Sequence, residues 1–143
     1  MKDTFIPANN SRTKQWFIIN AENKTLGRLA TEISKFLLGK TKVTYTPFLD
    51  TGAHVIILNV EKIVLSANKE RQKIYRTHSG RPGGMRVETF SKLQQSLPKK
   101  IILNAIKGML PKKVFGREIY KNLNVYKGNQ HPHRAQTPKL LHL

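Results

Sequence analysis

Asp50 and His54 are four positions apart, a spacing at which a carboxylate and an imidazole could serve as an acid–base pair. Gly52 stands between them, and an apolar run begins at His54, so the sequence favours a turn carboxylate followed by a strand-entry residue. The chain has no cysteine, no paired-carboxylate motif and no serine or threonine in a nucleophile motif. We therefore expect no enzymatic activity, with an acid–base pair as the weaker alternative.

The segment His131-Pro132-His133 places two imidazoles near each other, as a metal site would. Proline fixes an extended backbone between the rings, and the tail offers no third ligand, whereas zinc sites use three or four protein ligands. Metal binding is therefore the weaker alternative, and we expect no cofactor. With Arg134 and Gln136, these histidines are better suited to stacking on bases or to hydrogen bonding with phosphate or ribose.

The segment 76–86 combines arginine and histidine side chains with three glycines. Cationic side chains contact phosphates, and glycines let a backbone approach a folded RNA closely. The segment lacks the glycine-lysine-serine/threonine ending of a nucleotide-binding loop. Its other interpretation is a solvated loop whose glycines only permit turns.

The net charge decides between these interpretations. Lysine and arginine number 26 against 8 aspartates and glutamates, a formal charge of +18. Such an excess favours a polyanionic partner. Apolar runs such as 55–58 are far shorter than the roughly 20 residues that cross a membrane, and residues 1–12 do not resemble a secretory signal. Nucleic acid is therefore the expected partner, and the absence of cysteine fits a reducing compartment.

Hydrophobic periodicity predicts an α/β fold. Residues 16–19 and 54–58 are short apolar runs typical of covered strands, and the three-and-four spacing over 26–37 is typical of a helix. Thr25 is placed to cap this helix and Gly39 to end it, which gives a βαβ crossover. Further helices are expected at 89–97, 98–110 and 114–123, followed by a last strand at 125–126. We expect one domain over 1–143, with an N-terminal extension (1–14), a basic glycine-rich loop (68–87) and a basic C-terminal tail (128–143).

Five segments, taken together and in order, resemble one family. They are Leu26-Gly27-Arg28-Leu29-Ala30, Tyr45-Thr46-Pro47, His78-Ser79-Gly80-Arg81-Pro82-Gly83-Gly84, Lys107-Gly108-Met109-Leu110-Pro111, and His131-Pro132-His133 with Ala135-Gln136. The family is the large-subunit ribosomal protein numbered thirteen, in its bacterial and plastid form. The resemblance implies a three-layer α/β/α fold around a mainly parallel four-stranded sheet. It also implies binding to large-subunit ribosomal RNA, contact with neighbouring ribosomal proteins and a part in subunit assembly.

Two positions depart from the family pattern. Ala53 stands where an acid is usual, and Ala67 stands where a glycine is usual. We expect a positive φ to have moved from Ala67 to Asn68, which tolerates that conformation better. The opening residues 4–7 look most like cyanobacterial and plastid members, so we expect a chloroplast ribosome, with the bacterial cytoplasm as the alternative.

The predicted RNA-binding residues come from the basic segments and from the resemblance. They are Arg28, Lys40, Lys42, Lys69, Arg71, Lys73, Arg76, His78, Arg81, Arg86, Lys107, Lys112, Lys113, Arg117, His131, His133 and Arg134. Two other functions compete with a ribosomal one: an RNA-modifying or nucleotide-using enzyme, and a regulatory RNA binder that acts away from the ribosome.

Overall fold

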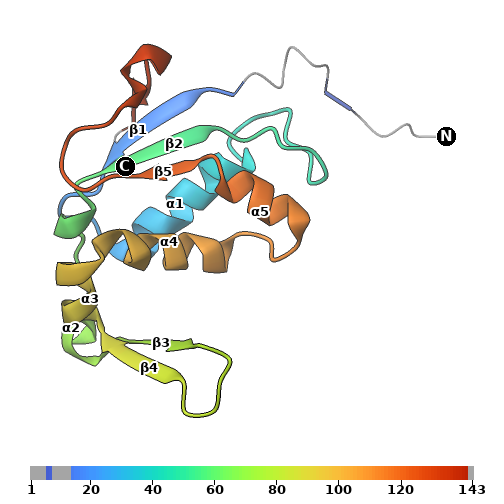
Figure 1. Ribbon diagram of the computed structural model, residues 1–143. Coiled ribbons are helices and arrows are strands. Elements are labelled where there is room, and N and C mark those ends of the chain that lie inside the picture. The colour runs from blue at the N-terminus through green and yellow to red at the C-terminus, as the bar shows by residue number, and fades with distance from the viewer. Residues whose placement is uncertain (1–5, 8–13, 142–143) are drawn as a thin grey trace.

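The computed structural model describes residues 6–7 and 14–141. Its centre is a four-stranded, fully parallel sheet in the order β5-β2-β1-β6 (Figure 1). The strands are β1 (Trp16–Asn20), β2 (His54–Leu58), β5 (Leu123–Val125) and β6 (Lys139–Leu140). The predicted α/β class and parallel four-stranded sheet are confirmed. The predicted extension 1–14 lies almost entirely outside the described residues.

The predicted crossover is formed by β1, helix α1 (Leu26–Leu38) and β2. Gly39 ends α1 in the left-handed conformation, with φ of 76°, as a residue without a Cβ does readily. Thr25 holds the N-cap position, but its side chain makes no capping hydrogen bond. Instead, the amide of Leu26 donates to the carbonyl of Val64 at 3.1 Å, which fixes the start of the helix.

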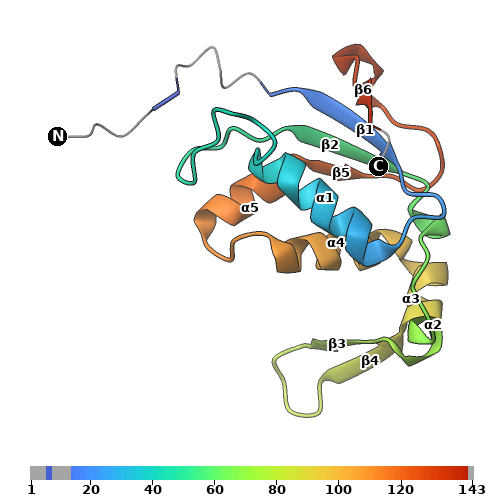
Figure 2. The same ribbon diagram turned by 180° about the vertical axis from the view of Figure 1, so that it is seen from behind.

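Helices α1, α4 (Pro98–Met109) and α5 (Val114–Tyr120) lie on one side of the sheet (Figures 1 and 2). The core between these layers contains apolar side chains with no measurable exposure, among them Ile33, Ile57, Ile102 and Ile106. Pro98 opens α4 at its first turn, where a missing amide hydrogen costs nothing, as predicted. This one-sided packing gives the sheet a rigid helical support.

The C-terminal tail covers part of the opposite side of the sheet. It contains the 3₁₀ helix η3 (His133–Gln136) and then β6, which pairs with β1 through Phe17↔Lys139 and Ile18↔Leu140. The third layer is therefore thin. The tail, which the sequence predicted only as a basic extension, thus supplies the fourth strand of the sheet.

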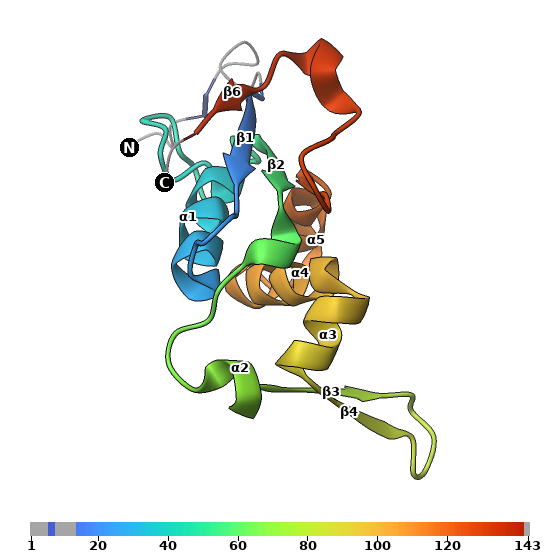
Figure 3. The ribbon, with the colours of Figure 1, turned by 90° about the vertical axis from the view of Figure 1, so that its left-hand side faces the viewer.

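The prediction that residues 68–87 form a loop is wrong. The chain forms the short helix α2 (Lys69–Gln72) and an antiparallel hairpin of β3 (Ile74–His78) and β4 (Met85–Thr89). This hairpin and α2 project away from the main sheet and its helices (Figure 3). Gly80 and Gly83 have φ of +87° and +69°, so glycine's conformational freedom serves only the turn between the strands.

Several element boundaries also differ from the predictions. Helix α3 (Phe90–Ser96) starts after β4, because Thr89 still pairs in the hairpin. Helix α5 ends at Tyr120, and β5 begins at Leu123 rather than at 125. The expected shift of positive φ to Asn68 is wrong: Ala67 itself has φ of 53°, and Asn68 has φ of −73°.

Candidate nucleic-acid interface

The hairpin and α2 carry the densest group of predicted RNA-binding residues. Lysine and arginine number six between 68 and 86, against the single carboxylate Glu70. The side chains that the prediction named here are all exposed: Lys69, Arg71, Lys73, Arg76, His78, Arg81 and Arg86. The structure thus brings this part of the predicted set together on one projecting unit.

Two contacts fix the hairpin to the body. Tyr75 is half-buried and packs against the hydrophobic core, and burial raises the pKa of its hydroxyl. Its cross-strand partner Glu88 lies 3.7 Å from Nζ of Lys100 on α4. Since successive residues of a strand point to opposite faces, Arg76 and His78 occupy the face opposite Tyr75. Arg86 pairs with Thr77 and so lies on the Tyr75 face, but it is exposed as well.

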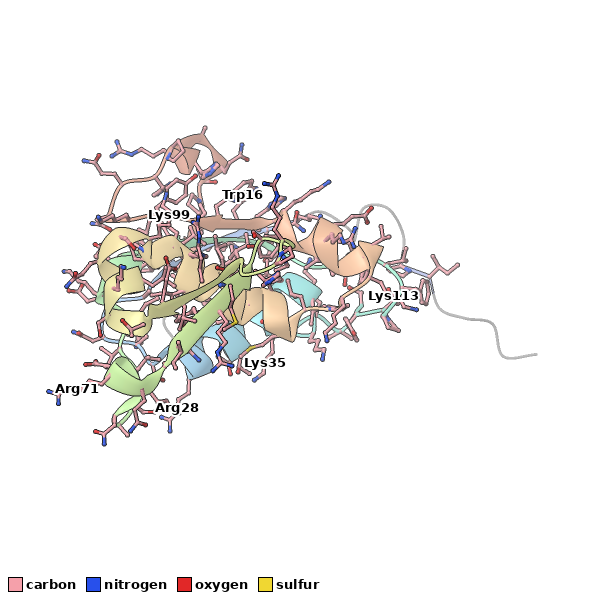
Figure 4. The ribbon with its side chains drawn as sticks, turned by 60° about the horizontal axis from the view of Figure 1, so that its bottom comes forward. Trp16, Arg28, Lys35, Arg71, Lys99 and Lys113 are labelled. Carbon is pink, nitrogen blue, oxygen red and sulfur yellow. The ribbon has the colours of Figure 1, made fainter. Side chains whose placement is uncertain are left out.

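The turn between α4 and α5 forms a second cationic region. Lys107, Lys112 and Arg117 line a cavity of about 430 Å³, together with apolar groups from Leu110 and Pro111. Lys113 is exposed immediately before α5. A cavity lined both by apolar groups and by several cations suits a phosphate-ribose segment. Figure 4 shows Lys113 and Arg71 toward opposite sides of the molecule. The hairpin also projects away from the helices that carry this turn (Figure 3), so the two regions are separate.

The predicted residues near α1 lie apart from each other. Arg28 lines a smaller hollow of about 300 Å³ near the start of α1, with Asn23 and Glu32. Lys40 is exposed just after Gly39 at the other end of the helix, and Lys42 is half-buried. The seventeen predicted residues therefore do not form one patch.

His133 has an intramolecular role that the sequence did not reveal. Its Nε2 lies 2.7 Å from the hydroxyl of Tyr126, and its ring lies 5.1 Å from that of Trp16. Trp16 in turn stacks on His54, with ring centroids 4.2 Å apart. These contacts fasten the tail to the sheet. Trp16 and His54 are register partners at the starts of β1 and β2. The signal available in the sequence was an aromatic residue at the start of one predicted strand and a histidine at the start of the next.

The rest of the tail is more open. Arg134 is exposed and lines a shallow hollow with Gln130, His131 and Pro132. His131 is half-buried, and its ring stacks with that of His133 at 6.5 Å. Among the residues that the structure describes, no group of three or more histidine, cysteine, aspartate or glutamate side chains could hold a metal ion.

Asp50 serves a structural purpose. Its Oδ2 accepts hydrogen bonds from Nζ of Lys14 at 2.6 Å and Nδ2 of Asn122 at 3.2 Å, and its Oδ1 accepts one from the amide of Gly52. Burial and the neighbouring ammonium of Lys14 lower the pKa of His54. The carboxylate therefore ties the loop before β2 to its neighbours, as a turn carboxylate does.

Comparison with known proteins decides the family. The model of the family described as ribosomal protein L13 matches residues 14–132. The chain belongs to the ribosomal protein L13 family. The large ribosomal subunit protein uL13 of Synechococcus sp. (strain WH7803) is 54% identical over 143 residues, covering 100% of this chain and 95% of that protein. The uL13 of Prochlorococcus marinus (strain NATL1A) is 55% identical with the same coverage.

The L13 match spans both cationic regions. The uL13 of Acaryochloris marina (strain MBIC 11017), 52% identical, covers 99% of this chain and 93% of that protein. The predicted resemblance to the family, in a form like that of cyanobacteria, is confirmed. The match to the family model ends at residue 132, whereas the cyanobacterial relatives extend through the tail that holds His133 and β6. No helix of the described residues is long and apolar enough to cross a bilayer.

Proposed function

We propose that this chain is a structural constituent of the large ribosomal subunit that binds large-subunit ribosomal RNA and helps the subunit to assemble. One observation carries the proposal: the chain matches, over its full length, proteins named as large-subunit components. The formal charge of +18 supports a polyanionic partner. Neighbouring ribosomal proteins are the other proposed partners, and neither a catalytic role nor a cofactor is proposed.

The proposed mechanism is electrostatic and geometric. Exposed cations of the hairpin, and those of the α4–α5 turn, displace counterions from phosphates, which makes binding favourable and dependent on salt. The two regions are held by one core, so separate RNA segments bound there would be fixed relative to each other. Arg134 and His131 in the tail would add contacts on the other side of the sheet. Folded RNA shape, rather than a short base sequence, would be recognised.

The ribosome concerned is of the bacterial or plastid type. The relatives described above come from cyanobacteria, which is compatible with both a bacterial and a plastid protein. We propose the plastid stroma as the compartment, with the bacterial cytoplasm as the alternative. Fractionation of the source cells, followed by detection of the chain in plastids or in bacterial ribosomes, separates these two.

The salt dependence of RNA binding tests the proposed function. Two double variants, Arg81→Gln with Arg86→Gln and Lys112→Gln with Lys113→Gln, each remove two charges from one region. A plot of log affinity against log salt concentration has a negative slope. We expect this slope to become shallower by roughly 1.4 to 1.8 in each variant, since each lost phosphate contact removes about 0.7 to 0.9. The probe is in vitro transcribed large-subunit ribosomal RNA from a cyanobacterium.

A matched control removes the same charge elsewhere. Lys35 and Lys62 are surface lysines whose ammonium groups lie 2.8 and 2.6 Å from Glu32 and Glu22. The variant Lys35→Gln with Lys62→Gln should keep the slope of the wild-type protein. Equal slopes in all three variants would contradict the assignment of the two cationic regions.

A further inference from the structure

The loop between α1 and β2 exposes apolar side chains that the hydrophobic core does not use. The side chain of Val43 is fully exposed, that of Phe48 is 52% exposed and that of Tyr45 is 36% exposed. Two of these three are aromatic and stand three positions apart. Neither Tyr45 nor Phe48 belongs to the cationic regions described above, so they call for a separate explanation.

The loop is held in place rather than loosely attached. Successive turns are closed by backbone hydrogen bonds, from the amide of Tyr45 to the carbonyl of Lys42 at 3.2 Å and from Leu49 to Thr46 at 3.4 Å. At the end of the loop, Asp50 is fixed by Lys14 and Asn122. A surface whose backbone is already ordered loses little conformational entropy when it binds.

The charge of the loop favours an anionic partner. Lys40 is exposed and Lys42 is half-buried, and residues 40–49 contain no carboxylate. The first carboxylate after them, Asp50, is neutralised by Lys14 at 2.6 Å. Exposed aromatic rings beside unopposed cations are the combination with which proteins bind single-stranded nucleic acid, because bases stack on rings and phosphates pair with cations.

We propose that Tyr45 and Phe48 form a stacking site for unpaired nucleobases of RNA, with Lys40 and Lys42 contacting the adjacent phosphates. This inference rests on the proposed RNA-binding function and adds to it a class of ligand: single-stranded nucleotides in a loop or bulge. The hairpin and the α4–α5 turn supply charge to the RNA backbone, whereas this loop supplies rings for bases. The site would therefore distinguish unpaired RNA from a continuous duplex.

The test compares two full-length variants with two RNA probes. Tyr45→Leu with Phe48→Leu keeps apolar side chains but removes both rings, and Tyr45→Phe with Phe48→Tyr keeps both rings. The probes are an RNA hairpin with an unpaired loop and a fully paired RNA duplex of equal length. Base–aromatic stacking supplies much of the affinity for an unpaired base, so we expect the leucine variant to lose roughly tenfold or more in affinity for the hairpin probe. Its affinity for the duplex, and both affinities of the ring-swapped variant, should be unchanged.

The outcomes separate this inference from the function on which it rests. Failure of the wild-type protein to bind either probe or ribosomal RNA would contradict both. Normal RNA binding by the leucine variant, or an equal loss on the two probes, would overturn the stacking site alone. If that variant kept its RNA affinity but associated poorly with large-subunit particles, the loop would be a docking surface for protein, which also overturns the inference.

Photochemical cross-linking gives a second measurement that does not depend on stability. The wild-type protein is irradiated with the hairpin probe carrying 5-iodouridine in its unpaired loop, since this base cross-links to rings stacked on it. We expect the adduct on the tryptic peptide 43–62, at Tyr45 or Phe48. Adducts found only on other peptides would contradict the proposed site.

Discussion

Gly116 lies so close to Pro111 that a Cβ added to it would be 1.7 Å from the carbonyl oxygen of that proline. Gly116 is buried in the first half of α5, and Pro111 follows α4. The absence of a side chain at this position therefore allows the two helices to meet at the turn. Lys112 and Arg117, at and just after this turn, line the cavity described above, so a packing requirement positions one of the proposed RNA-binding regions.

The variant Gly116→Ala should be destabilised by about 1–3 kcal/mol, the usual cost of overpacking. The added methyl group meets backbone, which cannot move aside as a flexible side chain can. Urea unfolding followed by circular dichroism measures the difference. Salt-dependent RNA binding should also weaken, because the turn that holds the cations shifts.

Gly108 provides the matched control for this substitution. It lies inside α4, and a Cβ there would meet nothing within 4 Å. Since glycine in a helix costs roughly 0.5–1 kcal/mol relative to alanine, Gly108→Ala should be neutral or slightly stabilising. If both variants had the same stability, the close approach of Gly116 to Pro111 would not constrain the turn.

The tail should loosen when the contact between His133 and Tyr126 is removed. β6 pairs with β1 through only two residue pairs, so we expect the contacts of His133 with Tyr126 and Trp16 to supply much of its attachment. In His133→Ala, the amide of Leu141, which donates to the carbonyl of Ile18 at 2.9 Å, should exchange its hydrogen several-fold faster. Hydrogen exchange resolved by residue measures this.

The exposed Arg134 lies next to His133 in the same 3₁₀ helix and is the control. Its replacement by alanine should leave the exchange rate of Leu141 unchanged. If hydrogen exchange at Leu141 accelerated equally in the two variants, the aromatic contacts of His133 would not be what holds β6.

Stability should decrease when the pH falls below about 6.5, the ordinary pKa of histidine. Burial, Lys14 and, more weakly, the charge of His133 lower the pKa of His54, while Asp50 acts in the opposite direction. The folded chain thus binds fewer protons at His54 than the unfolded chain does, so His54 stabilises the fold fully above this pH and loses that contribution on acidification. Thermal unfolding at several pH values between 5 and 7.5 measures the slope.

Replacing His54 by glutamine should make this pH dependence shallower. Equal slopes in the wild-type protein and in His54→Gln would contradict the assignment of this acid sensitivity to the histidine stacked on Trp16.

Local patterns predicted the centre of the fold well. The apolar runs at β1 and β2 and the spacing along α1 reflect burial against immediate neighbours, which leaves a direct trace in the sequence. Gly39 at the end of α1 and Pro98 at the start of α4 were predicted for the same reason. Their roles depend on backbone conformation at a single position.

The hairpin and the last strand could not be predicted in this way. β3 and β4 are mostly exposed and mix cations with apolar residues, so no burial pattern marks them. β6 pairs with β1 across more than a hundred positions, and two residue pairs leave no periodic signal. Ala67 has a positive φ despite the steric cost to a residue with a Cβ, which the sequence pattern did not indicate.

The sequence predicted which residues of the candidate interface are cationic, but not how they are arranged in space. The sequence identified exposed cations, and the structure shows that they divide between the hairpin, the α4–α5 turn, the region of α1 and the tail. His133 was predicted as a nucleic-acid contact, but it is held by Tyr126 and Trp16. In the sequence, Tyr45 stood out only as part of a segment that resembles the family. The exposure of the Tyr45 and Phe48 rings could not be predicted, because it depends on how the loop folds.

Sedimentation of the chain from cell lysate tests the central claim most directly. A tagged copy is expressed in a cyanobacterium, and gentle lysates are separated on sucrose gradients at low and at moderate salt. We predict that the chain travels with the large ribosomal subunit at both salt concentrations. Migration as free protein, or with other RNA outside ribosomal particles, would contradict a structural role in the subunit and would favour a regulatory RNA-binding protein.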